Sequence, residues 1–201
     1  MTLLLSVAIF PIINQSVSPS TILASCAGFL LITAPNRTWL VVSKDFHATV
    51  SLLLTVWNAD TGALIAGRVG TLAQTNLPRP LWLQTISPAK SVEGLIGGLL
   101  GGSLTYWSLP WFWSMIHYYK LAPNQETVSI VDSLSSNQRF CIGILLSIAA
   151  VLGDLWESSL KRAFQVKDSG KLLPGHGGVL DRFDSSLLAV VLYQYLGQTV
   201  P

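Results

Sequence analysis

Apolar runs separated by short polar breaks make up most of this 201-residue chain. The runs are continuous and not alternating, a pattern typical of membrane helices rather than of membrane strands. A helix needs about 20 apolar residues to cross a bilayer. We therefore predict an all-α, polytopic integral membrane protein with about 5–6 transmembrane helices. Five apolar runs cover residues 21–34, 48–67, 93–116, 140–156 and 181–195. A sixth helix would require the short run at 3–13 to cross the membrane as well.

The segments between these runs are polar or rich in proline. A Pro-Asn-Arg triplet at 35–37 is expected to close the first run, and residues 43–47 form a polar break before the second. We expect loops over residues 68–90, which are basic and carry three prolines, and over residues 121–139. Residues 68–90 and the basic segment 161–171 are expected on the cytosolic side, since positively charged loops favour that side.

Composition also favours a membrane location. Hydrophobic residues make up 50% of the chain, charged residues only 11%, and the mean hydropathy is +0.52, whereas soluble domains carry roughly 25% charged residues. The net charge of +2 is too small to indicate a nucleic-acid partner. Cys26 and Cys141 lie in apolar runs without a CxxC spacing, so we expect two buried thiols and neither a disulfide framework nor a zinc site. The N-terminus lacks the basic start of a cleaved signal peptide.

The run at 93–116 combines small and aromatic residues. Glycines at a spacing that lets helix backbones approach closely in lipid occupy Gly94, Gly97, Gly98, Gly101 and Gly102. They make this helix a candidate dimer interface. An aromatic belt at the membrane interface is predicted from Trp107, Trp111, Trp113, Tyr118 and Tyr119, and His117 is expected to be an interfacial residue rather than a ligand.

Ten of the 22 charged residues fall within the 31 residues from Asp154 to Asp184. Charge beside apolar helices is costly unless it is paired, hydrated or bound to metal or phosphate, so this stretch is the first candidate site. Asp181 and Asp184 are three residues apart and share a helix face, as do Asp154 and Glu157. Such carboxylate pairs suit Mg²⁺, which is typically held by one or two carboxylates together with substrate phosphates.

Cations and glycines lie between the two acidic pairs, namely Lys161, Arg162, Lys167 and Lys171, followed by the sequence PGHGG at 174–178. Cationic side chains and exposed backbone N–H groups suit a polyphosphate. The alternative is a solvated loop with ordinary ion pairs, such as Glu157 with Lys161. Asp60 adds a second signal, because an Asp within a span is expected to face the bundle interior or a wet cavity unless it lies at the interface.

At these residues the chain resembles the phosphatidate cytidylyltransferase (CDP-diacylglycerol synthase) family. The family signature, S-x-x-K-R, K-D, P-G-H-G-G and D-R-x-D, is matched with every spacing kept at Ser158, Lys161, Arg162, Lys167, Asp168, Pro174 to Gly178, Asp181, Arg182 and Asp184. Two further blocks agree: residues 57–62 with Gly67-Arg68, and Ser87-Pro88 with Lys90, Glu93, Gly94, Gly97 and Gly98.

The resemblance covers about residues 48–199, and there are departures from the family pattern. Family members commonly have an aromatic residue where Leu64 stands, and a lysine and a threonine where Ala89 and Ser91 stand. They also usually have a longer N-terminal membrane region. We therefore expect residues 1–47 to be a shortened N-terminal membrane region and residues 48–201 to be the catalytic membrane domain.

The resemblance implies an enzyme that transfers the cytidylyl group of CTP to phosphatidic acid, giving CDP-diacylglycerol and pyrophosphate. It implies Mg²⁺ at Asp181 and Asp184 and a second cation, suggested to be K⁺, at Asp154. Ser158 and Lys161 are expected to join these three as catalytic residues. It further implies a homodimer, and the basic segments lead us to expect the active site toward the cytosolic face of the bilayer. Substrate binding is expected of Asp60, Lys90, Arg162, Lys167, Asp168, His176, Gly177, Gly178 and Arg182.

Three other functions remain as alternatives. A CTP-dependent polyprenol- or phytol-type lipid kinase would combine the same elements, although PGHGG followed by DRxD favours cytidylyl transfer. A non-catalytic membrane subunit is disfavoured because the acidic residues Asp154, Asp181 and Asp184 and the cation Lys161 are all retained. A transporter is disfavoured because the charges cluster in one segment and do not line several facing spans.

Overall fold

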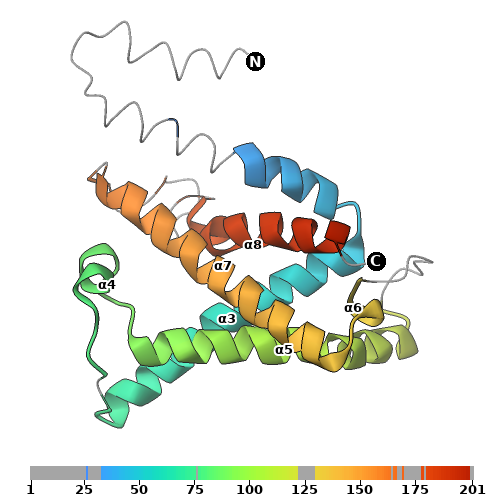
Figure 1. The fold of residues 1–201 in the computed structure, drawn as a ribbon, viewed down its shortest axis with the longest axis horizontal. Helices are drawn as coiled ribbons and strands as arrows, with labels where there is room; N and C mark the ends of the chain where they lie inside the picture. The colour runs from blue at the N-terminus through green and yellow to red at the C-terminus, as the bar shows by residue number, and fades with distance from the viewer. Residues whose placement is uncertain are drawn as a thin grey trace, which may run out of the picture.

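The computed structural model describes residues 26, 33–75, 77–121, 130–163, 165–166, 169, 178 and 180–199, and every regular element within them is a helix (Figure 1). A first helix covers residues 33–42. The elements that follow are α3 (Phe46–Leu72), α4 (Leu81–Ile86), α5 (Val92–Tyr118), α6 (Ile130–Ser133), α7 (Ser136–Ala163) and α8 (Leu180–Thr199). The predicted all-α class is confirmed for this part of the chain.

Two short polar segments cap the long helices α3 and α5. The Asp45 carboxylate accepts hydrogen bonds from the backbone amides of His47 (2.8 Å) and Ala48 (3.1 Å) at the start of α3. The Ser91 hydroxyl accepts one from the amide of Gly94 (3.1 Å) at the start of α5. Side-chain oxygens at these positions satisfy amides that have no partner inside the helix. The polar break predicted at 43–47 therefore has a structural role as a cap.

Helices α3 and α5 cross in close contact because glycines line their interface (Figure 1). A Cβ atom added to Gly97 would lie 2.6 Å from the carbonyl oxygen of Gly62, and one added to Gly101 would lie 2.5 Å from that of Asn58. Neither position leaves room for a side chain. The small-residue spacing is thus explained by packing within the chain. These glycines contact α3, and the homodimer stays a prediction that they do not support.

The core lies where α3, α5, α7 and α8 meet. Fully or nearly fully buried side chains come from each of these helices, and include Leu52, Tyr106, Leu146 and Val190. The indole N–H of Trp113, on α5, donates a hydrogen bond of 3.0 Å to the buried hydroxyl of Ser51, on α3. This core fixes the four helices relative to one another and so positions the charged residues that they carry.

Two of the described helices, α3 and α7, are long and apolar enough to cross a membrane. Helix α5 is as long as α3 but is rich in glycine and aromatic residues, and α8 carries polar residues in its first two turns. These two candidate spans are consistent with a membrane-embedded helical protein. The predicted total of five to six stays a prediction, and the runs at 3–13 and 21–34 fall almost entirely outside the described residues.

Three predicted boundaries are wrong. The triplet at 35–37 does not end a helix, since the helix continues to residue 42 and the chain turns at Ser43 and Lys44. The loop predicted over 68–90 contains the end of α3 and the whole of α4. The loop predicted over 121–139 contains α6 and the start of α7. Each of these segments contains a helix end or a short helix beside polar residues or prolines, and hydropathy alone does not distinguish such a segment from a loop.

The cysteines and one tryptophan also differ from expectation. Both Cys26 and Cys141 are free, as expected, but their side chains are exposed and not buried. An apolar run marks a lipid-facing side chain as readily as a core side chain, so the run could not place them. Trp113 is only 4% exposed and belongs to the core, whereas Trp107 and Trp111 are exposed as an interfacial belt requires.

His117 makes a contact that the sequence did not predict. It is exposed, and its Nε2 lies 3.1 Å from Nε2 of the buried His47, with the two rings stacked. The pair sits beside Trp113, where α3 begins and α5 ends.

Candidate functional site

Asp154 is held between two residues that reach it from different directions. Oδ2 of Asp154, on α7, forms an ion pair of 2.5 Å with the ammonium of Lys90, which lies in the segment just before α5. Its Oδ1 accepts a hydrogen bond of 3.3 Å from the hydroxyl of Ser158, one turn further along α7. The side chains of Lys90 and Asp154 are 20% and 28% exposed. This contact ties a residue of the second sequence block to the charged stretch.

Lys161 links α7 to α8. Its ammonium pairs with Glu157 one turn earlier on α7, as the i, i+4 spacing predicts, and lies 3.0 Å from Oδ1 of Asp181 at the start of α8. All three side chains are largely shielded, with Glu157 5% exposed, Asp181 11% and Lys161 19%. One ammonium therefore compensates two carboxylates in a place where uncompensated charge is costly.

The Asp181 carboxylate collects further donors from the segment between the helices. The backbone amide of Ser169 lies 3.1 Å and 3.0 Å from its two oxygens, and the amide of Gly178 lies 2.7 Å from Oδ2. Asp181 lies in the first turn of α8, outside the two candidate spans. Burial raises the pKa of Asp181, but the Gly178 amide, Lys161 and Ser169 outweigh it and hold that pKa well below its usual range. Asp181 is ionised at neutral pH.

Asp184 belongs to a second carboxylate group, which joins α8 to α3. It accepts hydrogen bonds from the backbone amide (2.7 Å) and the hydroxyl (3.2 Å) of Ser185. The same hydroxyl lies 3.0 Å from Oδ2 of Asp60, a residue of α3, so its one hydrogen is shared between the two carboxylates. Ser185 therefore bridges Asp184 and Asp60. Asp60 was expected to face the bundle interior or a wet cavity unless it lies at the interface; its side chain is exposed, and it contacts the buried Ser185 of α8.

A glycine on α7 brings these groups close together. A Cβ atom added to Gly153 would lie 2.5 Å from the carbonyl oxygen of Asp184, so α7 and α8 are in backbone contact beside Asp154. Any side chain at Gly153 would push the two helices apart. Asp154, next to Gly153, is thereby brought near Asp184, which Ser185 links to Asp60 on α3.

Carboxylate oxygens are the ligands that Mg²⁺ prefers, and crowded like charges favour a bound cation. The carboxylates of Asp60, Asp154 and Asp184 fit a hard cation in their chemistry. Within the described ranges, no three His, Cys, Asp or Glu side chains are close enough together to form a ready-made metal site. Asp181 is directed to the Lys161 ammonium and to backbone amides, so its predicted role as a metal ligand requires it to exchange some of these donors for the metal.

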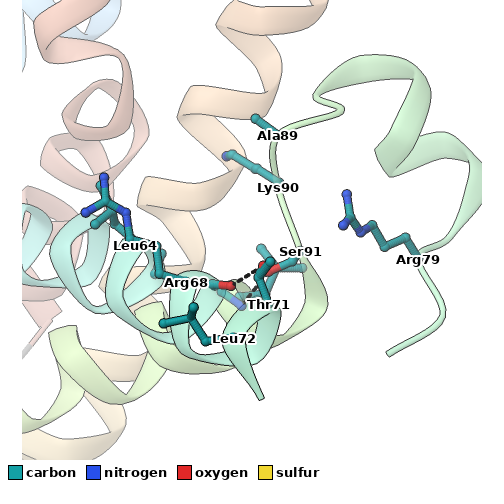
Figure 2. A pocket seen from close by; sticks show the side chains of 12 residues that line it. Leu64, Arg68, Thr71, Leu72, Arg79, Ala89, Lys90 and Ser91 are labelled. Atoms are coloured by element: carbon teal, nitrogen blue, oxygen red, sulfur yellow. Dashed lines mark hydrogen bonds between the residues drawn. The ribbon is translucent and has the colours of Figure 1, made fainter. Parts of the chain in front are cut away.

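A cavity of about 620 Å³ lies next to this charged group, between the C-terminal part of α3 and the start of α5 (Figure 2). Lys90 lines the cavity and also pairs with Asp154, so the cavity and the carboxylates share one residue. Two arginines, Arg68 and Arg79, also line it.

The structure brings together most of the predicted site residues that it describes: Asp60, Lys90, Asp154, Ser158, Lys161, Gly178, Asp181 and Asp184. Arg162 is exposed at the end of α7. Lys167, Asp168, His176 and Gly177 lie outside the described residues, as does the side chain of Arg182. Sequence reasoning missed Ser185; its only signal was a pair of serines directly after Asp184 in an otherwise apolar helix.

Comparison with known proteins shows which proteins this chain is similar to. A family model described as the cytidylyltransferase family matches residues 1–200. A phosphatidate cytidylyltransferase of Staphylococcus saprophyticus is 37% identical over 154 residues, which are 77% of this chain and 50% of the relative. The enzyme of that name from Staphylococcus haemolyticus is 38% identical with the same coverage. One from Synechocystis is 38% identical over 152 residues, which are 73% of this chain and 42% of the relative. The chain spans about half the length, or less, of these curated relatives.

Proposed function

Because the chain belongs to the cytidylyltransferase family, we propose that it transfers the cytidylyl group of CTP to phosphatidic acid, producing CDP-diacylglycerol and pyrophosphate. The observation that carries this proposal is the paired group at the α7–α8 junction, where Lys161 holds Asp181 and Lys90 holds Asp154. Cations and carboxylates gathered beside apolar helices suit a reaction between a water-soluble triphosphate and a lipid phosphate. The names of the relatives support the same substrates.

In this reaction a phosphate oxygen of phosphatidic acid attacks the α-phosphorus of CTP. A new P–O bond forms, the bond between the α-phosphorus and the oxygen that bridges to the β-phosphorus breaks, and pyrophosphate leaves with that electron pair. The attacking oxygen is already anionic, so no strong base is needed. Catalysis rests on positioning and on stabilising the charge of the phosphates.

The described residues divide these tasks. Lys161 and Lys90 are the cations nearest the carboxylates, and each can turn from its carboxylate to a phosphate oxygen, because a charge-assisted bond to phosphate replaces the one it loses. The Gly178 amide can make the same exchange, from Asp181 to a phosphate. Ser158 keeps Asp154 oriented through its hydrogen bond. The sequence predicts that Arg162, Lys167 and His176 add further contacts.

We propose Mg²⁺ at Asp181 and Asp184, with Asp154 holding a second cation that the family resemblance suggests is K⁺. When bound, Mg²⁺ supplies positive charge that offsets the charge of the phosphates. The Ser185 hydroxyl links the Asp184 carboxylate to Asp60 on α3. We further propose a multi-pass arrangement with this group facing the cytosol, where CTP is available, and a homodimeric assembly.

The direct test is to incubate the full chain in detergent with phosphatidic acid, Mg²⁺ and CTP labelled either at the α- or at the γ-phosphate. Label from α-labelled CTP in the lipid, with release of pyrophosphate, is the expected result. Lipid label from γ-labelled CTP alone would replace the proposal with a lipid kinase. If neither α-labelled nor γ-labelled CTP labels the lipid, and the chain does not bind CTP, a non-catalytic subunit would be favoured.

Asp184→Asn gives the matched control for this experiment. Asn keeps the size and the neighbours of Asp184 but loses its charge, so lipid labelling should vanish while the variant elutes and melts like the parent. Lys44→Gln serves as the unaffected comparison, because Lys44 is exposed at the turn before α3.

A further inference from the structure

Two of the three histidines of the chain, His47 and His117, meet outside the charged group. His47 lies at the start of α3 and His117 near the end of α5, and their Nε2 atoms are 3.1 Å apart. Along the axis of α3, Asp60 lies about 20 Å from His47, at about 1.5 Å a residue. The histidine pair is therefore a separate place in the fold, which the proposed reaction does not use.

The contact between the two rings leaves room for one hydrogen. A neutral imidazole carries a hydrogen on one ring nitrogen and offers a lone pair on the other. The two Nε2 atoms form a hydrogen bond when one of them carries the hydrogen. When both rings carry their hydrogen at Nδ1 instead, two lone pairs meet, and neutral imidazole nitrogens are the commonest metal ligands in proteins.

The distance between the two nitrogens fits a transition ion. Bonds from Zn²⁺ to imidazole are about 2.0–2.1 Å long. Two such bonds to atoms 3.1 Å apart enclose an angle of about 95–102° at the metal. This angle lies between about 90° for square-planar coordination and about 109° for tetrahedral coordination. Imidazole suits Zn²⁺, Ni²⁺ and Cu²⁺, whereas Mg²⁺ and Ca²⁺ prefer oxygen ligands.

One ring of the pair is held in place by the core. His47 is only 6% exposed, and its ring centroid lies 4.3 Å from that of the buried Trp113. The indole of Trp113 is fixed in turn by its hydrogen bond to Ser51. A ligand whose rotamer is fixed by packing loses little entropy when it binds a metal. His117 is exposed, so an ion can reach the pair from outside.

The charges around the pair are compatible with a cation. The end of α5 is the negative end of its helix dipole, and the positive start of α3 is offset by the Asp45 carboxylate, which accepts the amide of His47 at 2.8 Å. Lys44 and Lys120 are the nearest cations along the chain, and both are exposed, where salt screens them. Within the described ranges no third His, Cys, Asp or Glu joins the pair, so water must complete the coordination.

We propose that His47 and His117 form a two-histidine site for a late first-row transition ion, such as Zn²⁺, Ni²⁺ or Cu²⁺. The ion takes the place of the shared hydrogen and links the start of α3 to the end of α5. A metal that binds only the folded chain stabilises it, so this ion acts as a clamp between the two helices. The sequence alone favoured an interfacial role for His117, because its partner is 70 positions away and no spacing reveals it.

Metal binding is measured on the full chain in detergent, purified with a tag that contains no histidine. Zn²⁺ and Ni²⁺ are titrated by calorimetry, and Cu²⁺ is followed by electron paramagnetic resonance, in which bound imidazole nitrogens split the signal. At a Ni²⁺ concentration 100 times its dissociation constant, the melting temperature should rise by about 5–11 °C. His117→Gln should weaken binding of each ion by at least about tenfold, since even outer-shell partners of a metal contribute that much.

Three further variants separate the pair from other ligands. His47→Gln should weaken binding as His117→Gln does, and its melting temperature without metal shows whether this buried substitution still folds. His176→Gln removes the third histidine, and Asp184→Asn removes a carboxylate of the proposed Mg²⁺ site. Both should keep the nitrogen splitting of bound Cu²⁺ and the rise in melting temperature with Ni²⁺.

The outcomes decide the inference without any measurement of turnover. Absence of binding in the parent chain, or unchanged binding in the exposed variant His117→Gln, would overturn it and leave a hydrogen bond alone. Loss of the nitrogen splitting in His176→Gln or Asp184→Asn would place the ion at the charged group and would also overturn it. Because cytidylyl transfer is not among these readouts, a failure of the proposed function leaves this result unaffected.

Discussion

The contact between α3 and α5 gives a prediction that can be worked from distances. A Cβ atom at Gly62 would lie 2.5 Å from the carbonyl oxygen of Gly97 and 3.3 Å from Cα of Gly101, both backbone atoms that cannot turn aside. Ordinary contacts begin at 3.4 Å, so Gly62→Ala forces the two helices apart by about 0.9 Å at this point. Asp60, two residues earlier, would move with α3.

The magnitude follows from comparison with a second glycine on the same helix. A Cβ atom at Gly67 would meet the Ser91 hydroxyl at 3.2 Å and the Cα of Gly94 only at 3.9 Å, so Gly67→Ala requires a small adjustment of one side chain. Both substitutions gain the same helix propensity, about 1 kcal/mol relative to glycine. The difference between them is therefore the cost of overpacking, about 1–3 kcal/mol.

Thermal unfolding of the two variants in the same detergent measures this difference. For a chain of this size it corresponds to a melting temperature about 2–12 °C lower for Gly62→Ala than for Gly67→Ala. Cytidylyl transfer, measured below both transitions, should fall in Gly62→Ala because Asp60 is displaced from Ser185. Equal melting temperatures would show that α3 and α5 are not as close at Gly62 as these distances indicate, and would refute the prediction.

Four further predictions concern the charged group. Asp181→Asn and Asp184→Asn should each abolish turnover in a folded protein, and activity near that of the parent in either would remove the metal assignment. Lys161→Ala should destabilise the protein by about 3 kcal/mol, because it leaves the shielded Glu157 and Asp181 without their ammonium. The double variant Lys161→Ala, Glu157→Gln should recover part of that loss. If it recovers none, Lys161 does not stabilise the fold by pairing with both carboxylates. Asp60→Asn should slow transfer without a change in melting temperature, which a purely structural role would not produce. A chelator should stop transfer, and added Mg²⁺ should restore it; activity that persists in the chelator would take the metal out of the mechanism.

Most of the helical framework could be predicted from hydropathy. The runs at 48–67, 93–116 and 140–156 correspond to α3, α5 and α7, which extend beyond them at both ends. The extension of α7 carries polar residues and the charge of Arg139, and the Asp45 cap lies just before α3. The hydropathy pattern identifies the apolar middle of such a helix but not its polar ends. The predicted loops at 68–90 and 121–139 were therefore too long.

The residues of the candidate site could be predicted from the sequence, but most of the contacts between them could not. The i, i+4 spacing indicated that Glu157 contacts Lys161, because both lie on one helix. The partners of Asp154 and Asp60 come from other helices, and no spacing along the chain reveals them. The i, i+3 spacing of Asp181 and Asp184 suggested a shared role, yet their described partners are different: Lys161 and backbone amides for one, Ser185 for the other.

The hydrogen bond between Ser185 and Asp60 also sets a time at which the site can first exist. The two residues are 125 positions apart, so at about 5–20 residues per second the ribosome needs about 6–25 s to make the second after the first. Throughout that interval Asp60 stands in an apolar helix without its partner, a costly state for a charge in a membrane. A nascent chain in which α8 has not yet docked therefore holds its first helices before the contact between Asp60 and Ser185, and with it this part of the candidate site, exists.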